Sequence, residues 1–360
     1  GSDSETVQLT ILTNPVLAAA NIAISSSNCK GNNVTVTLSN MVDGNYTINY
    51  NLSLANVLAN QNANVNIVNG SGTFTINATD IPNIGTTRVT FLSITNIATT
   101  CITLINPNVS ADFILKPSPN LETKNIVIDD ICIGSSLKVV ISGATAGLVD
   151  GNYQFAYSIP NATPTTGNSG IVTIADGTGQ FTVPASYFTN AGDYNFTITS
   201  ISNLTSGCNN LSEDASAAFQ VFPIPDVSGA TINATSACLN FSNEVFITGA
   251  INLSDGIYTI NYQLSGANSS TSSSSVTFVN GRGSFIIPAT DLNNSGNVTI
   301  TVTQLTSNVS QCGSSASVIN PFTFAVTELE TPEIVTKGNE FCDADNPTIA
   351  DLSANVTTPG

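Results

Sequence analysis

Hydrophobic and polar residues alternate along this chain with a period of two, and the same alternation is written three times. Each copy holds two such segments, the second longer than the first. The apolar positions of the longer segment are Tyr46, Ile48, Tyr50 and Leu52, then Tyr153, Phe155, Tyr157 and Ile159, then Tyr258, Ile260, Tyr262 and Leu264. Because side chains two apart on a strand share a face, the pattern predicts strands with one side in a core.

A hairpin signature follows in each copy, in which Asn-Gly or Asp-Gly precedes a second glycine and a phenylalanine. The turn residues are Asn69-Gly70, Asp176-Gly177 and Asn280-Gly281, and the second glycines are Gly72, Gly179 and Gly283. Asn and Asp before Gly tolerate the positive φ that a type I′ turn needs. We expect the second glycine to occupy a β-bulge beside the turn.

The alternating segments and the turn signals predict about seven strands in each copy and no helix of useful length. This is the pattern of an all-β chain built from tandem immunoglobulin-like or fibronectin-like β-sandwich domains. Tandem modules usually form an elongated array, which spans distance and presents surfaces.

Prolines mark the expected borders between the sandwiches, since proline stiffens linkers. They recur after each final strand as Pro15, Pro119, Pro225 and Pro332. We therefore expect sandwich modules at 14–117, 118–223 and 224–328. Residues 1–13 are interpreted as a cloning scar, Gly1-Ser2, with the last strand of a preceding module, and residues 329–360 as the start of a truncated following one.

The balance of charge excludes several classes of partner. Only 9% of the residues are charged and the formal net charge is −17, so nucleic acid and anionic membrane surfaces would repel the chain. No apolar run is long enough to span a bilayer, and we expect no membrane insertion. Histidine is absent, which removes the commonest general base and metal ligand. The sequence predicts a monomer that is not an enzyme and needs no cofactor.

Seven cysteines recur as two per module, which indicates disulfides and an oxidising location outside the cytoplasm. The simplest pairing joins Cys29 to Cys101, Cys132 to Cys208 and Cys238 to Cys312, and leaves Cys342 without a partner. One difficulty is that five predicted strands separate the two cysteines of a module. An odd number of crossings places them at opposite ends of a sandwich, beyond disulfide reach. The rival pairing joins Cys101 to Cys132, Cys208 to Cys238 and Cys312 to Cys342.

Two kinds of ligand are compatible with the sequence. Acidic residues near two borders, with Asp129, Asp130, Asp343 and Asp345 as candidates, could bind Ca²⁺ and stiffen the array, or could simply be solvated. The repeated tyrosines could form a patch that binds carbohydrate. We expect them instead to fill the core, with their hydroxyls reaching partners at its rim.

Three features resemble the repeat modules of very large Bacteroidota cell-surface adhesins, the SprB-type gliding adhesins. They are Cys-x-Gly-x-x-Val-x-Val from Cys29 to Val36, an Asn- and Thr-rich strand that runs to a late cysteine, and the segment from Glu340 to Leu352. The likeness covers nearly the whole chain, although Asn240 stands where the motif has glycine. The resemblance implies type IX secretion, attachment to the outer cell surface, and a role in adhesion or gliding motility.

The sequence thus predicts a non-catalytic part of a long extracellular adhesin, in which disulfide-stapled modules form a rod. With strands of about ten residues, three modules would span on the order of 100 Å. Its partners would be other modules of the same chain and an extracellular surface or glycan that the sequence does not identify. The alternatives are a carbohydrate-binding array and a calcium-stiffened structural stalk.

Overall fold

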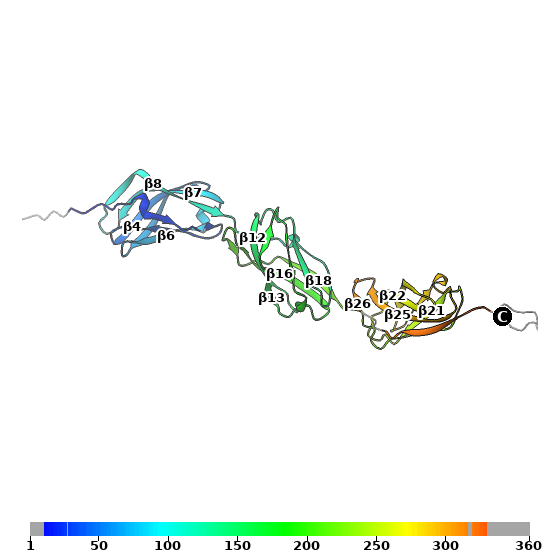
Figure 1. Ribbon diagram of the computed structural model, residues 1–360. Coiled ribbons are helices and arrows are strands. Elements are labelled where there is room, and N and C mark those ends of the chain that lie inside the picture. The colour runs from blue at the N-terminus through cyan, green and yellow to red at the C-terminus, as the bar shows by residue number, and fades with distance from the viewer. Residues whose placement is uncertain (1–10, 27, 316–318, 330–360) are drawn as a thin grey trace, which may run out of the picture. The chain divides into compact units, whose positions relative to one another are not determined.

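The computed structural model describes residues 11–26, 28–315 and 319–329 (Figure 1). Contacts divide them into two compact units. The second unit begins at Val221 and also takes in Asp130–Ile133 and Asn190–Gly192, while the first holds the remainder. Most of the strand predicted within residues 1–13, and nearly all of the module start predicted at 329–360, lie outside the described residues.

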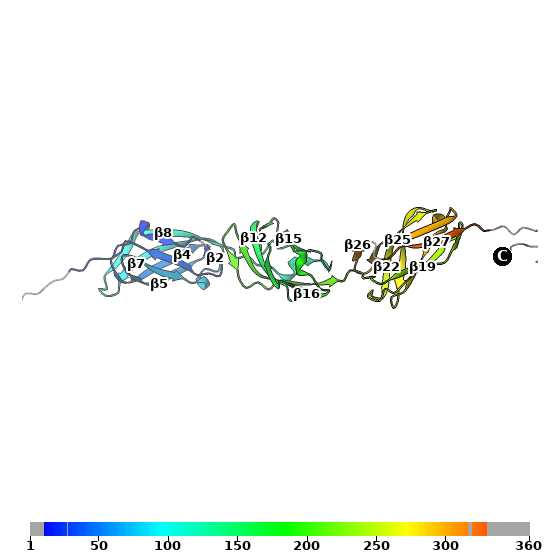
Figure 2. The same cartoon turned by 60° about the horizontal axis from the view of Figure 1, so that its bottom comes forward.

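Residues 22–116 form two facing sheets. The smaller sheet has the order β1-β3-β6, and the larger has the order β2-β8-β7-β4-β5, whose strands lie side by side in Figure 2. The bounds are β1 Ile22–Ile24, β2 Asn28–Cys29, β3 Val34–Leu38, β4 Gly44–Leu54, β5 Leu58–Ile67, β6 Gly72–Ile76, β7 Gly85–Asn96 and β8 Ile102–Lys116. We call this pair of sheets the first sandwich.

The same plan recurs twice. The second sandwich, in residues 126–222, pairs the sheets β15-β11-β9 and β10-β18-β16-β12-β13, and the third, in residues 231–327, pairs β19-β21-β24 and β20-β27-β25-β22-β23. The second has β9 Ile126–Ile128, β10 Ile131–Cys132, β11 Leu137–Ile141, β12 Gly151–Ser158, β13 Thr166–Asn168, β14 Val172–Ile174, β15 Gly179–Val183, β16 Gly192–Asn203, β17 Asn209–Asn210 and β18 Ser216–Phe222. The third has β19 Thr231–Ala234, β20 Ala237–Cys238, β21 Asn243–Thr248, β22 Gly256–Gly266, β23 Ser270–Phe278, β24 Gly283–Ile287, β25 Gly296–Ser307, β26 Gly313–Ser315 and β27 Phe322–Thr327.

The chain is therefore all-β, with immunoglobulin-like sandwiches in tandem, as the alternation predicted. Its helices are single turns of three residues, such as Ala78–Asp80. Within the described residues, none is long and apolar enough to cross a membrane.

The core of each sandwich is built from the positions that alternate in the sequence. All four predicted apolar positions on β4, β12 (with Ile159 just beyond it) and β22 are buried. Aromatic rings cross between the sheets, as where Phe181 of β15 stacks 5.9 Å from Phe155 of β12. The first tyrosine of each pair donates its hydroxyl to the carbonyl four residues earlier, at 2.7–2.9 Å, in Tyr46, Tyr153 and Tyr258. The prediction that the tyrosines are core residues with rim partners is confirmed.

The predicted type I′ turns are also confirmed. The φ angle is +51° at Asn69 and +78° at Gly70, and both turn residues are equally left-handed in the other two copies. The carboxylate of the signature aspartate accepts a hydrogen bond from the turn backbone. Asp43 accepts from the N–H of the second turn residue, Gly70, at 2.8 Å, whereas Asp150 and Asp255 accept from the N–H of the first, Asp176 and Asn280, at 2.9 and 2.7 Å. The aspartate of the repeated signature and the hairpin turn of the same copy are therefore in contact in the fold.

The predicted bulge at the second glycine is wrong. Gly72 pairs in regular register with Leu38, and register shifts in this sandwich lie on β4 and β7 instead. Glycine is needed here because the chain crosses from one sheet to the other. A Cβ at Gly72 would lie 2.3 Å from the carbonyl oxygen of Asn66 on β5. The same crowding holds at Gly179 and Gly283.

Short strands at the start of each sandwich escaped prediction. β2, β10 and β20 contain two residues each, too few to show any periodicity. Each pairs in parallel with the last strand of its own sandwich, β8, β18 or β27. In each of them the second residue is a cysteine, so pairing to the last strand holds that cysteine in place.

Candidate functional site

The described cysteines fall into two structural classes. The short-strand cysteines, Cys29, Cys132 and Cys238, end the strands β2, β10 and β20. The turn cysteines, Cys101, Cys208 and Cys312, follow the strands β7, β16 and β25. Five strands, β3 to β7, separate Cys29 from Cys101, so the two cysteines lie at opposite ends of the first sandwich.

The pairing predicted within each module is wrong, and so is the rival pairing. The structure contains the disulfides Cys29–Cys208 and Cys132–Cys312, each between the short-strand cysteine of one sandwich and the turn cysteine of the next. The physical reason is the odd number of strand crossings, which keeps the two cysteines of one sandwich apart. Cys101 and Cys238 make no disulfide, and Cys342 lies outside the described residues.

Both bonds have ordinary geometry for a disulfide. The Cα atoms are 5.6 Å apart in Cys29–Cys208 and 5.7 Å apart in Cys132–Cys312. They join residues 179 and 180 positions apart in the sequence. Cys208 and Cys312 are fully buried. Disulfides persist in oxidising compartments, so these bonds are typical of an extracellular or secreted protein.

The backbone holds the short-strand cysteines in one way in all three sandwiches. Cys29 is in register with Lys116, Cys132 with Phe222, and Cys238 with Thr327. The residue after each cysteine then donates its N–H to the carbonyl of that partner. These bonds are Lys30 to Lys116 at 2.8 Å, Ile133 to Phe222 at 2.9 Å, and Leu239 to Thr327 at 2.8 Å.

The turn cysteines share a frame of their own. The residue before each cysteine has a positive φ, +58° at Thr100, +77° at Gly207 and +58° at Gln311. Each cysteine donates its N–H to the hydroxyl two residues earlier, that of Thr99, Ser206 or Ser310, at 3.2–3.4 Å. Its own carbonyl accepts at 2.9 Å from the N–H of Asn96, Asn203 or Ser307. The same turn geometry therefore holds all three turn cysteines.

Polar contacts surround the first staple, within the first compact unit. Lys116, at the end of β8, donates from Nζ to the carbonyl of Ser206 at 2.9 Å. Ser118 donates to the carbonyl of Lys30 at 2.7 Å. Sequence reasoning missed Lys116, although a cation at the end of a strand stands out in a chain with seven Lys and Arg residues.

The linkers are packed against the sandwiches that follow them. Pro15, Pro119 and Pro225 are buried. After Pro119, the N–H of Leu121 donates to the carboxylate of Glu213 at 3.1 Å, and Glu213 is only 8% exposed. The prolines were predicted only to stiffen the linkers, and the structure adds that they are anchored.

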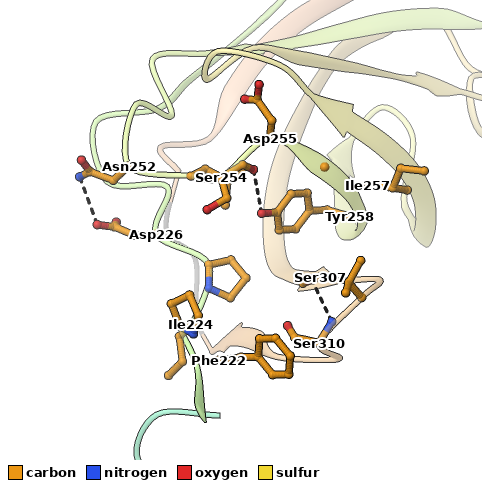
Figure 3. A pocket seen from close by; sticks show the side chains of 15 residues that line it. Phe222, Ile224, Asp226, Asn252, Ser254, Asp255, Ile257, Tyr258, Ser307 and Ser310 are labelled. Carbon is orange, nitrogen blue, oxygen red and sulfur yellow. Dashed lines mark hydrogen bonds between the residues drawn. The ribbon is translucent and has the colours of Figure 1, made fainter. Parts of the chain in front are cut away.

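Where the linker reaches the third sandwich, it leaves a hollow of about 300 Å³ in the second compact unit (Figure 3). The end of β18 at Phe222 and the linker residue Ile224 line one side, and the end of β25 at Ser307 and the turn residue Ser310 line another. Its tyrosine, Tyr258, is 6% exposed and donates its hydroxyl to the Ser254 carbonyl. The buried ring offers no stacking face to a sugar, so the hollow is better explained by packing at the linker.

The structure describes only two of the four acidic candidates for Ca²⁺. Asp129 and Asp130 are exposed, and Asp343 and Asp345 lie outside the described residues. Of the neighbouring acids, Asp112 accepts two hydrogen bonds from Arg88 at 2.7 and 2.8 Å, which lower the pKa of that carboxyl. Glu122 pairs with Lys124 at 2.8 Å. In the part of the chain that the structure describes, no three His, Cys, Asp or Glu side chains form a group that could hold a metal ion.

No protein-family model matches the chain, and no curated protein matches it. Solved structures of tandem immunoglobulin and fibronectin domains are similar to it. The FN1–FN3 domains of chicken CNTN1 align over 84% of this chain and 97% of their own, with 13% identity and a TM-score of 0.36. The titin I-band fragment I67–I69 covers 88% and 99%, with 11% identity and a TM-score of 0.33. A marsupial T cell receptor covers 82% and 99%, with 9% identity and a TM-score of 0.34. Similarity at this level says nothing about ligand or activity.

Proposed function

We propose that this chain is a non-catalytic, load-bearing part of a long cell-surface adhesin, in which each sandwich is stapled covalently to the next. The observation that carries the proposal is the pair of disulfides that join successive sandwiches, Cys29–Cys208 and Cys132–Cys312. The resemblance to SprB-type modules supports export by the type IX route, placement on the outer surface, and a role in adhesion or gliding. The array would act as a spacer, and another segment would bind the surface.

The two staples overlap in the sequence, and the overlap gives them a mechanical effect. Cys132 lies inside the loop that Cys29–Cys208 closes, and Cys208 lies inside the loop that Cys132–Cys312 closes. A force applied at residues 29 and 312 can therefore pass through both disulfides and the backbone between Cys132 and Cys208. That backbone is 76 residues long (208 − 132), whereas the reduced chain offers 283 residues (312 − 29).

Single-molecule pulling tests this proposal. At about 3.5 Å per extended residue, the oxidised chain should stop extending near 270 Å between residues 29 and 312, even when every sandwich has unfolded. After treatment with a reductant, the same segment should reach about 1,000 Å. Equal extension before and after reduction would refute a covalent load path.

Surface placement needs its own experiment. Antibody against the chain should label intact cells of the source organism, and the label should be lost when the type IX secretion system is disabled. Labelling that appears only after the cells are permeabilised would contradict the placement on the outer surface, while leaving the mechanical proposal untouched.

A further inference from the structure

The first and the third sandwich each contain a cysteine that makes no disulfide but lies where the bonded cysteines lie in the other sandwiches. Cys238 ends β20 as Cys29 ends β2 and Cys132 ends β10, and Cys101 follows β7 as Cys208 follows β16 and Cys312 follows β25. As residues, Cys238 is exposed and Cys101 is partly exposed. Neither makes a disulfide in the described structure.

The frame around each half is the same as in the completed staples. The Leu239 N–H donates to Thr327 at 2.8 Å beside Cys238, as the Lys30 N–H donates to Lys116 at 2.8 Å beside Cys29. At the other half, Thr100 has the φ of +58° that Gln311 has before the bonded Cys312. The geometry that positions sulfur in two formed disulfides is therefore already in place at both open halves.

Apolar side chains are exposed beside both open halves. Near Cys238, Phe241 is 57% exposed, and its N–H donates to the Cys238 carbonyl at 3.1 Å. In the turn of Cys101, Ile97 is 47% exposed, and Val42, which lines a hollow with Thr99 of this turn, is 76% exposed. Contact between the two ends would remove part of this surface from water and would favour their association.

We propose that Cys238 and Cys101 are complementary halves of a further staple, each of which bonds to the opposite end of another sandwich of this kind, and that between separate copies of this chain Cys238 of one copy bonds to Cys101 of a second. The partner that each half recognises is the opposite end of a sandwich of this same kind. This inference rests on the proposed function. The same kind of disulfide that joins successive sandwiches would also join separate copies of the chain.

The bond forms by two thiol–disulfide exchanges with a small-molecule disulfide as oxidant. The Cys238 thiolate attacks oxidised glutathione, forms a mixed disulfide and releases one glutathione thiolate. The Cys101 thiolate of the second copy then attacks the Cys238 sulfur and releases the second glutathione. Two thiol protons are lost, and two electrons pass from the pair of cysteines to the oxidant.

Two variants test the complementarity, both carrying Cys342→Ser so that one thiol remains outside the two staples. Cys101→Ser leaves only the Cys238 thiol, and Cys238→Ser leaves only the Cys101 thiol. In oxidised glutathione, an equimolar mixture should form disulfide dimers about tenfold faster than either variant alone, because only the mixture offers both halves. Non-reducing gels measure the dimer, and mass spectrometry identifies the joined peptides.

A matched control separates recognition from simple thiol exposure. Ser273 is an exposed residue in the middle of β23, so a variant with Cys101→Ser, Cys238→Ser, Cys342→Ser and Ser273→Cys moves the single remaining thiol away from β20. This variant should dimerise slowly with the partner that carries only Cys101. Dimers that form as fast with the control, or as fast within each single variant, would overturn the proposal. A mixture that stays monomeric would overturn it too, and neither result would alter the pulling behaviour of a single chain.

Discussion

The signature aspartates Asp43, Asp150 and Asp255 show how one residue type can be repeated for a structural reason. Each lies just before a strand of the larger sheet and accepts a hydrogen bond from the hairpin turn at the end of the next two strands. The bond satisfies a backbone N–H of a left-handed turn. The Asp-Gly and Asn-Gly pairs recur together along the chain because they are in contact in the fold.

Replacing Asp150 with alanine should destabilise the second sandwich by about 1 kcal/mol, because the N–H of Asp176 loses its acceptor. Asp150→Asn keeps an acceptor oxygen at the same place and should cost clearly less. Denaturant unfolding followed by tyrosine fluorescence gives both values. Equal losses for the two variants would show that charge, and not the hydrogen bond, matters at this position.

Gly179 offers a second test at the residue scale. A Cβ there would lie 2.5 Å from Cδ1 of Ile174 and 3.0 Å from the carbonyl of Thr173. Gly179→Ala should therefore destabilise the sandwich by about 1–3 kcal/mol through overpacking. Gln180→Ala, at the exposed next position of β15, is the control and should change stability little. A neutral Gly179→Ala would mean that the hairpin can shift to admit the methyl group.

At the scale of the element, the long strands were predictable and the short ones were not. β4, β12 and β22 alternate over enough residues for a period of two to be recognised. β2, β10 and β20 are held by backbone pairing to the last strand, which leaves no mark on the side-chain pattern.

The tyrosines on these long strands predict how stability depends on pH. Burial raises the pKa of Tyr50, Tyr153, Tyr157, Tyr258 and Tyr262 above the ordinary value. In the unfolded chain tyrosine ionises near pH 10. The stabilisation from keeping these phenols neutral is therefore complete below about pH 10 and is lost as the pH rises further.

The free energy of unfolding should fall between about pH 10 and pH 12, measured by urea titration at each pH, with phenolate absorbance reporting ionisation. Tyr157→Phe should make the fall shallower, because burial and the neighbouring Tyr187 raise the pKa of Tyr157. A stability that stays flat above pH 10 would contradict the burial of these hydroxyls.

At the scale of the whole molecule, the overlapping staples should give a graded series of pulling lengths. With Cys132→Ser alone, the shortest path from residue 29 to residue 312 uses the remaining disulfide and 104 residues (312 − 208). With Cys29→Ser alone, it uses 103 residues (132 − 29). At about 3.5 Å per residue, each single variant should stop near 360 Å, between the fully stapled and the reduced chain. Single variants that extend as far as the reduced chain would show that the two staples do not act independently.

The sequence by itself determined the features that depend on near neighbours in the chain. The period-two strands, the type I′ turns, the buried tyrosines and the all-β class follow from side chains a few residues apart, whose preferences are local. The odd count of strands between the two cysteines of a module raised a difficulty for pairing them, but the sequence still favoured that pairing, which is wrong. Only the tertiary structure decided which cysteines bond. The partners are about 180 residues apart and lie in different sandwiches. The pairing joins residues of different sandwiches, and no local pattern in the sequence records that.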